Sequence, residues 1–259
     1  MTNLQQAKLG LKSYNKAFSF IFKNKMGWTF LVPIVLNILL FALAQNFILD
    51  LIDYIKNLVG EWSAVQDSSF WQLTTSFAAG FLVEIIFFIV FAYLGGYLAL
   101  MIMSPLLSYI SEKTEKILTG NDYEFNFGYL IKDTIRGIIM AIRNMLIELF
   151  FLILAIIIGF IPVIGLFAAI LLFFVSAYFY GFSFIDYYNE RKRLSIKQST
   201  EIVRKHKGLA ISNGGVFALS LLVPFCGSYL VLFVSIISVV AATMAMVEID
   251  KEQQQTTDK

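Results

Sequence analysis

Long apolar runs separated by polar connectors set the pattern of this chain. Residues 28–49 contain no charged side chain, and at about 1.5 Å per residue a helix of that length crosses the roughly 30 Å hydrocarbon core of a bilayer. Residues 73–103 form a second run that is longer than a bilayer requires, so its helix should tilt or project beyond the membrane. The pattern predicts two long transmembrane helices in an all-α integral membrane protein.

Two apolar segments in the second half, residues 146–185 and 209–247, share a hairpin plan with an uncharged Pro-x-x-Gly tip. The tip residues are Pro162 and Gly165 in the first segment and Pro224 and Gly227 in the second. Proline fixes φ and glycine can adopt a positive φ, so this pattern indicates a turn. The first legs, residues 146–161 and 209–223, would reach only about 24 Å and 22 Å as helices. We therefore expect two short, partly penetrating helical hairpins. Four full crossings are the alternative, because the second legs are long enough to cross alone.

Residues 1–27 contain an amphipathic helix. Apolar side chains recur at steps of three and four between residues 4 and 22, while Lys8, Lys12 and Lys16 fall on another face. Such a helix lies in the membrane interface with its lysines toward the headgroups, or it packs on the protein's own cytoplasmic face. A second helical pattern, at residues 129–145, carries a basic stripe. That stripe consists of Lys132, Arg136 and Arg143.

Charge in the connectors indicates the orientation. Residues 50–72 are acidic, whereas residues 1–27 and 186–208 are rich in lysine. The positive-inside rule places these two basic segments and the connector 104–145 in the cytoplasm, so both hairpins start and end on that side. A polar tail at residues 248–259 completes a single membrane domain with a cytoplasmic N-terminus.

Composition agrees with a membrane protein and excludes several other classes. The chain is 58% hydrophobic and 15% charged, against about 45–50% and about 25% in soluble domains. Cys226 and His206 are the only cysteine and the only histidine, so we expect no disulfide, metal site or cofactor. The connectors hold no nucleophile–base pair or phosphate loop, which argues against an enzyme. The basic run at residues 191–193 is typical of a solvated face and not of a nucleic-acid site.

Polar side chains inside the apolar runs are candidates for a transport pathway. These candidates are Asn37, Glu84 and Glu148. A charge at mid-helix costs about 2.5–3.5 kcal/mol, so such groups face protein, water or a partner. A water-filled path or a proton-coupled step is one interpretation, and an oligomer contact or a position in a helix portion outside the bilayer is the other. Glu148 follows the expected start of its helix, where the helix dipole favours a carboxylate.

Four motifs together resemble a known family. They are LVPIVLNILL at residues 31–40, SPLLSYISE through LTG at residues 104–120, FIPVIG at residues 160–165, and Ser176-Ala177-Tyr178 leading to Asp186-Tyr187. Their order and spacing, over roughly residues 20–250, resemble the CysZ-type sulfate permeases of the etoposide-induced-protein superfamily. The resemblance implies two true spans, two partly penetrating hairpins, a homo-oligomer in the bacterial inner membrane, and sulfate uptake for cysteine synthesis.

An anion that crosses a bilayer must exchange its hydration shell for backbone N–H groups at helix starts and a few cations. The chain offers proline breaks and basic side chains for this purpose, although headgroup contact also explains the cations. The breaks are at Pro105, Pro162 and Pro224, and the cations are Lys23, Lys25, Lys132 and Arg136. Ser108 and Glu112 join the anion-binding candidates.

The sequence departs from the family at two of these places. The basic pair that family members carry before the first span reads Gly27-Trp28 here, and a family glycine reads Ser108. We therefore predict a transporter or channel for a small anion, sulfate by default. A non-transporting membrane scaffold that acts through its interfacial helices is the alternative.

Overall fold

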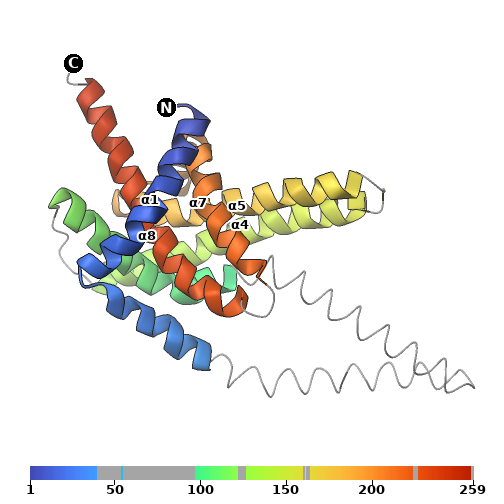
Figure 1. Ribbon diagram of the computed structural model, residues 1–259, viewed down its shortest axis with the longest axis horizontal. Helices are drawn as coiled ribbons and strands as arrows, with labels where there is room; N and C mark the ends of the chain where they lie inside the picture. Colours follow the sequence, from blue (N-terminus) through green and yellow to red (C-terminus); the bar gives the residue numbers. More distant parts are fainter. Residues whose placement is uncertain are drawn as a thin grey trace, which may run out of the picture. The chain divides into compact units, whose positions relative to one another are not determined.

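Helices make up the regular structure of the described part of the chain (Figure 1). The computed structural model describes residues 1–39, 54, 97–121, 127–159, 161, 164–223 and 227–257. Two compact units can be distinguished: residues 1–30 together with 94–259, and residues 31–93. Residues 73–96 of the expected second span and most of the acidic connector lie outside the described residues, and residues 97–103 belong to the helix at residues 97–119.

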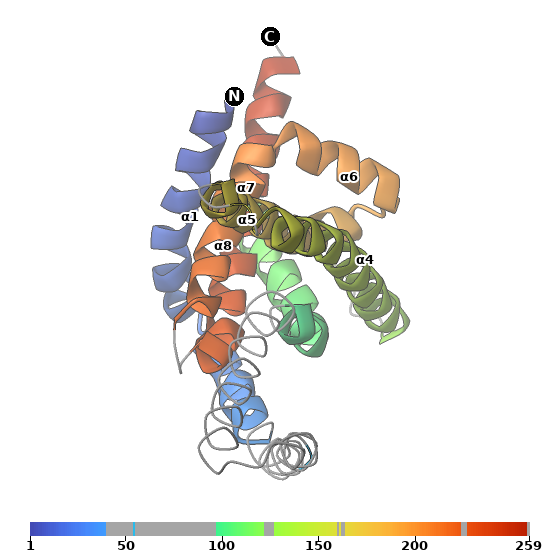
Figure 2. The same cartoon turned by 90° about the vertical axis from the view of Figure 1, so that its right-hand side faces the viewer.

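The first unit contains most of the described helices (Figures 1 and 2). They are α1 (Asn3–Lys23), the short 3₁₀ helix η1 (Gly27–Phe30), a helix at residues 97–119, α4 (Phe127–Gly159), α5 (Ile164–Arg191), α6 (Ile196–Lys205), α7 (Lys207–Leu221) and α8 (Gly227–Thr257). Three segments are long and apolar enough to cross a membrane: Thr134–Gly159, Phe167–Arg191 and Tyr229–Gln255. All three lie in the half of the chain where we expected partly penetrating hairpins.

The first hairpin is longer than its apolar pattern indicated. α4 begins at Phe127 and runs for 33 residues, about 50 Å, through the basic stripe and into the apolar leg. The expected short first leg is therefore wrong for this hairpin. Residues 127–145 contain no proline, and Arg136 and Arg143 have partners on α5 and α6, so the helix continues into the apolar leg. Figure 1 shows α4 and α5 side by side as one arm.

The second hairpin keeps its short first leg. α7 has 15 residues, about 22 Å, and α8 has 31. Pro162 and Pro224 lie outside the described residues, but the tip glycines lie in the first turns of α5 and α8. A Cβ atom added to Gly165 would lie 2.8 Å from the carbonyl oxygen of Gly159. A Cβ atom added to Gly227 would lie 2.6 Å from the carbonyl oxygen of Leu221. These glycines allow a close approach of the two legs, and neither has the positive φ that the turn pattern suggested.

α1 packs on the helices of its own unit. Thr2 and Gln5 form a capping box at its start. A face with several small side chains packs on α7 and α8; its buried members are Gln6, Leu9, Gly10, Ser13, Ala17 and Ile21. A second stripe of large apolar side chains stays exposed: Leu4, Leu11, Phe18 and Phe22. Packing on the protein's own helices is thus confirmed, and contact of the exposed stripe with lipid stays a prediction.

The helix at residues 97–119 passes through Pro105 without interruption, so the expected break there is wrong. It ends at Thr119, and Gly120 follows with a φ of 76°, the left-handed conformation that commonly follows a helix end. Ser111 of this helix lies 2.6 Å, oxygen to oxygen, from Thr243 of α8. The helix is thereby attached to the same helical core as α5, α7 and α8.

Candidate functional site

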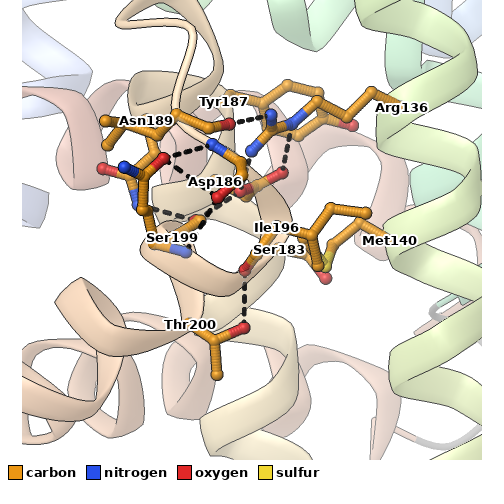
Figure 3. A network of polar contacts seen from close by, with 12 residues as sticks. Arg136, Met140, Ser183, Asp186, Tyr187, Asn189, Ile196, Ser199 and Thr200 are labelled. Carbon is orange, nitrogen blue, oxygen red and sulfur yellow. Dashed lines mark hydrogen bonds and ion pairs between the residues drawn. The ribbon is translucent and has the colours of Figure 1, made fainter.

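Asp186, near the end of α5, is the centre of a polar network that joins α4, α5 and α6 (Figure 3). Arg136 of α4 donates to both carboxylate oxygens, from Nη2 to Oδ1 at 3.0 Å and from Nε to Oδ2 at 3.3 Å. Ser199 of α6 donates to Oδ1 at 2.5 Å, and Asn189 donates to the Ser199 hydroxyl at 2.9 Å. One carboxylate therefore holds three helices together.

Arg136, a candidate anion ligand, is largely engaged by this network. Its Nη1 also donates to the carbonyl of Leu194, so all three guanidinium nitrogens have acceptors in the protein. The side chain is 18% exposed and that of Asp186 is 2% exposed. An anion that binds here would compete with a buried carboxylate, so anion binding by Arg136 stays a prediction.

Arg191 and Glu115 form a second buried ion pair. The distance from Arg191 Nε to Glu115 Oε2 is 2.7 Å, and both side chains are less than 5% exposed. The expectation of a solvated basic run is therefore wrong for Arg191, whose partner lies far away in the sequence. Lys192 pairs with Asp250 beside them, on the wall of a mainly polar cavity of about 440 Å³. This cavity carries both signs of charge, so its lining does not favour anions alone.

Lys23 and Lys25 are exposed in the turn that connects α1 to the apolar helix Gly27–Leu39. Lys25 has a φ of 56°, and its N–H donates to the Phe22 carbonyl oxygen at 3.2 Å. The first N–H groups of a helix have no acceptor within the helix, and its N-terminus carries partial positive charge. Two ammonium groups immediately before such an end suit an anion.

Trp28 brings this turn against the helix at residues 97–119. Its ring centroid lies 6.0 Å from that of Tyr109. Lys113 Nζ lies 5.8 Å from the centroid of the Tyr109 ring. Tyr109 is the neighbour of Ser108, which is buried, and Glu112 is half-buried one turn further along. The structure therefore gathers the start of the first apolar helix and the segment that contains Ser108 and Glu112.

Arg136 belongs to the separate network around Asp186, and Lys113 was not among the candidates. The signal for Lys113 was its position four residues after Tyr109, which puts both on one face of the helix. Asn37 is half-buried within the second unit, and Glu84 lies outside the described residues. In the part of the chain that the structure describes, no group of three or more His, Cys, Asp or Glu side chains could hold a metal ion.

Glu148 lies in the middle of α4 and is fully buried. Tyr97 Oη donates to its Oε2 at 2.5 Å, and Ser176 Oγ donates to its Oε1. The expected help from the helix dipole is wrong, because α4 begins at Phe127 and the dipole acts within the first turn. Two hydroxyl groups from other helices supply the interactions instead.

The sequence matches the family described as sulfate transporter CysZ/etoposide-induced protein 2.4 over residues 13–234. It is similar to a protein named sulfate transporter CysZ from Pseudomonas fluorescens strain Pf0-1, with 26% identity over 200 residues, which are 75% of this chain and 76% of that protein. A protein of the same name from Pseudomonas aeruginosa strain LESB58 is 24% identical over 200 residues, 75% and 78% of the two chains. A third, from Pseudomonas fluorescens strain SBW25, is 31% identical over 129 residues, 49% and 51% of the two chains.

Proposed function

Because the chain belongs to the sulfate transporter CysZ/etoposide-induced protein 2.4 family, we propose that it carries sulfate across the bacterial inner membrane. The family match along residues 13–234 is the observation that carries the proposal. Three helices of sufficient length and hydropathy for a membrane support it. The family description names a transporter and not an enzyme, in line with the lack of catalytic patterns in the connectors.

Anion recognition is assigned to the start of the first apolar helix. Sulfate is a dianion that must exchange water for N–H donors and cations before it enters a low-dielectric region. Lys23 and Lys25 precede Gly27 and Trp28 at the start of this helix, and Lys113 lies on the other side of the Trp28–Tyr109 contact. In this assignment lysine ammonium groups replace the basic pair that the family carries just before the first span.

The remaining candidates follow from the same proposal. Ser108 supplies a hydroxyl beside the recognition turn, and Asn37 lies ten residues into the helix that begins there. Arg136 acts mainly as a positioning group, since Asp186 and Leu194 already occupy its guanidinium.

The short α7 favours partial penetration by the second hairpin. Exposed apolar side chains along α4 and α5 suit lipid or a second copy of the chain.

Flux of radiolabelled sulfate into proteoliposomes tests the proposal. We expect uptake that depends on the protein and that excess unlabelled sulfate suppresses. Sulfite, thiosulfate and chloride as competitors identify the preferred anion, because the departure at Gly27 and Trp28 bears directly on selectivity. Lack of flux for sulfate and for all three competitors would contradict transport and favour a membrane scaffold.

A further inference from the structure

Glu148 is a buried carboxyl group far from both ends of its helix. It lies 21 residues after Phe127 and 11 residues before Gly159, so about 16 Å of helix separate it from the tip of the hairpin. Its side chain has no exposed surface, and it falls within the segment Thr134–Gly159 that can cross a membrane. A titratable group at this depth requires partners from the protein.

Its partners are two hydroxyl groups on two other helices. Tyr97, on the helix at residues 97–119, donates to Oε2 at 2.5 Å, and Ser176 of α5 donates to Oε1. The Tyr97 ring packs against Tyr180 of α5 in a tilted arrangement with centroids 4.7 Å apart, and Tyr180 packs edge-on against Phe217 of α7 at 4.9 Å. The carboxyl group of α4 therefore contacts the helix at residues 97–119 and α5, and the aromatic rings of Tyr97, Tyr180 and Phe217 pack in a row next to it.

The charges that face Glu148 are few. The titratable group that contacts it is Tyr97 from the helix at residues 97–119, and α5 contributes the Ser176 hydroxyl. Tyr180 of α5 contacts Tyr97 and not the carboxyl group. Among the described residues no lysine, arginine or histidine pairs with it. Hydroxyl groups differ from cations in one decisive way, because a hydroxyl can donate to a carboxylate and accept from a carboxylic acid. The site can therefore hold the group with or without a proton.

We propose that Glu148 is a proton-binding residue inside the membrane, and that its protonation accelerates the passage of the anion. The inference rests on the proposed transport function. A proton adds to one carboxylate oxygen and yields a neutral acid, and the hydroxyl group at that oxygen turns from donor to acceptor. No other bond changes. The carboxylate form repels an approaching dianion through a medium of low dielectric, and protonation removes that repulsion.

Sulfate flux measured between pH 5 and pH 9 tests the proposal in the intact protein. We expect wild-type flux to rise as pH falls, by at most about tenfold per pH unit, the limit for one titrating group. Glu148→Gln keeps the shape and both hydrogen bonds but binds no proton, so its flux should stay near the wild-type acid level at every pH. Glu148→Asp should keep the pH dependence with a shifted midpoint. Glu201→Gln, which changes an exposed carboxylate, should behave like the wild type.

Two hydroxyl variants and one spectroscopic measurement separate the site from the transport function. Tyr97→Phe and Ser176→Ala each remove one donor, and each should move the midpoint of the profile without abolishing it. Infrared difference spectra on acidification should contain a carboxylic-acid band that Glu148→Gln lacks and Glu201→Gln retains.

The outcomes distinguish the two claims. A pH profile of Glu148→Gln that equals the wild-type profile would overturn the inference while leaving sulfate transport intact. Lack of wild-type sulfate flux at every pH would contradict the proposed function. In that case the infrared band decides whether Glu148 binds a proton, and its absence from the wild type would refute the site.

Discussion

Gly214 of α7 faces the backbone of Ala177 of α5 so closely that a Cβ atom at Gly214 would lie 1.9 Å from the Ala177 carbonyl oxygen. The contact is matched in the opposite direction, since a Cβ atom at Gly181 would lie 1.9 Å from the Ala210 carbonyl oxygen. Two glycines therefore let the two helices approach backbone to backbone. The nearest atom to each added Cβ belongs to the backbone, so no side chain could move aside to relieve the clash.

Gly214→Ala should consequently separate α5 from α7. Overpacking of this kind costs about 1–3 kcal/mol or more, because the backbone itself must shift. Thermal unfolding in detergent should show a clear loss of stability. Gly215→Ala is the matched control: its Cβ atom would meet only the Ala177 Cβ at 3.9 Å, and alanine is the better helix former by roughly 1 kcal/mol. Equal loss in both variants would contradict the close approach.

The pair Arg136–Asp186 should show strong coupling in a double-mutant cycle. Removal of Asp186 leaves a largely buried guanidinium without its carboxylate, and breaking a buried pair costs about 3–5 kcal/mol. We expect Asp186→Asn to be strongly destabilising and Arg136→Gln/Asp186→Asn to recover part of the loss. The pair Lys192–Asp250, with side chains 38% and 28% exposed, is the control and should contribute less than about 1 kcal/mol. Additive effects at Arg136 and Asp186 would refute the coupling.

Tyr14 should link the stability of α1 to alkaline pH. Its hydroxyl donates to the Asn213 carbonyl oxygen at 2.8 Å and lies 2.5 Å from Ser238 Oγ. Burial raises the pKa of Tyr14 above its ordinary value of about 10, and the hydrogen bond with Ser238 opposes this only in part. The folded state holds the proton more tightly than the unfolded state, so the contribution is complete below pH 10 and is lost above it.

Tyr14→Phe should therefore cost about 1 kcal/mol at neutral pH, and its difference from the wild type should shrink above pH 10. Thermal unfolding of both proteins between pH 7 and pH 11 measures this difference. Tyr229→Phe, which removes the hydroxyl of a side chain 41% exposed, is the matched control. A constant difference between wild type and Tyr14→Phe up to pH 11 would contradict the titration.

Lys25 offers a test of the recognition turn. Its φ of 56° is strained for most side chains, so Lys25→Gly removes the ammonium group without adding backbone strain. We expect the concentration of sulfate at half-maximal flux to rise severalfold, because one cation is lost beside the start of the helix. Lys197→Gly, at an exposed position on α6, should leave that concentration unchanged. An unchanged concentration for Lys25→Gly would remove the turn from the binding site.

The sequence predicted features that depend on local patterns. The spacing of apolar side chains between residues 4 and 22 predicts α1, because the amphipathic pattern is written in neighbouring residues. The partner of Arg136 could not be found in this way, since Asp186 lies fifty residues further along and belongs to another helix. The burial of Arg191 could not be predicted for the same reason, since its partner Glu115 belongs to another helix.

Charge also misplaced a helix boundary. The charged side chains at residues 129–145 predict a connector that is separate from the apolar leg. In the structure, α5 and α6 supply partners to Arg136 and Arg143, so one helix continues through both segments. Glu148, which is expected near a helix start, therefore lies well inside α4. The sequence marks Glu148 as a titratable group in an apolar run, but its hydroxyl partners Tyr97 and Ser176 belong to other helices and could not be predicted from it.

Thiol labelling should decide how deeply the two hairpins enter the bilayer. In a Cys226→Ser background, cysteine at Ile161 probes the first tip and cysteine at Val223 the second, and both side chains are exposed in the isolated protein. The first hairpin has legs of 33 and 28 residues, either of which exceeds a bilayer core of about 30 Å. The second hairpin has one leg of 15 residues, about 22 Å, which is too short to cross.

We therefore expect Ile161→Cys to react with a membrane-impermeant maleimide from the periplasmic side more readily than Val223→Cys. Cysteine at Lys197, in a cytoplasmic segment under the predicted orientation, should react only after the membrane is opened. Rapid periplasmic labelling of Val223→Cys would show that the short leg spans the membrane after all, and would overturn partial penetration by the second hairpin.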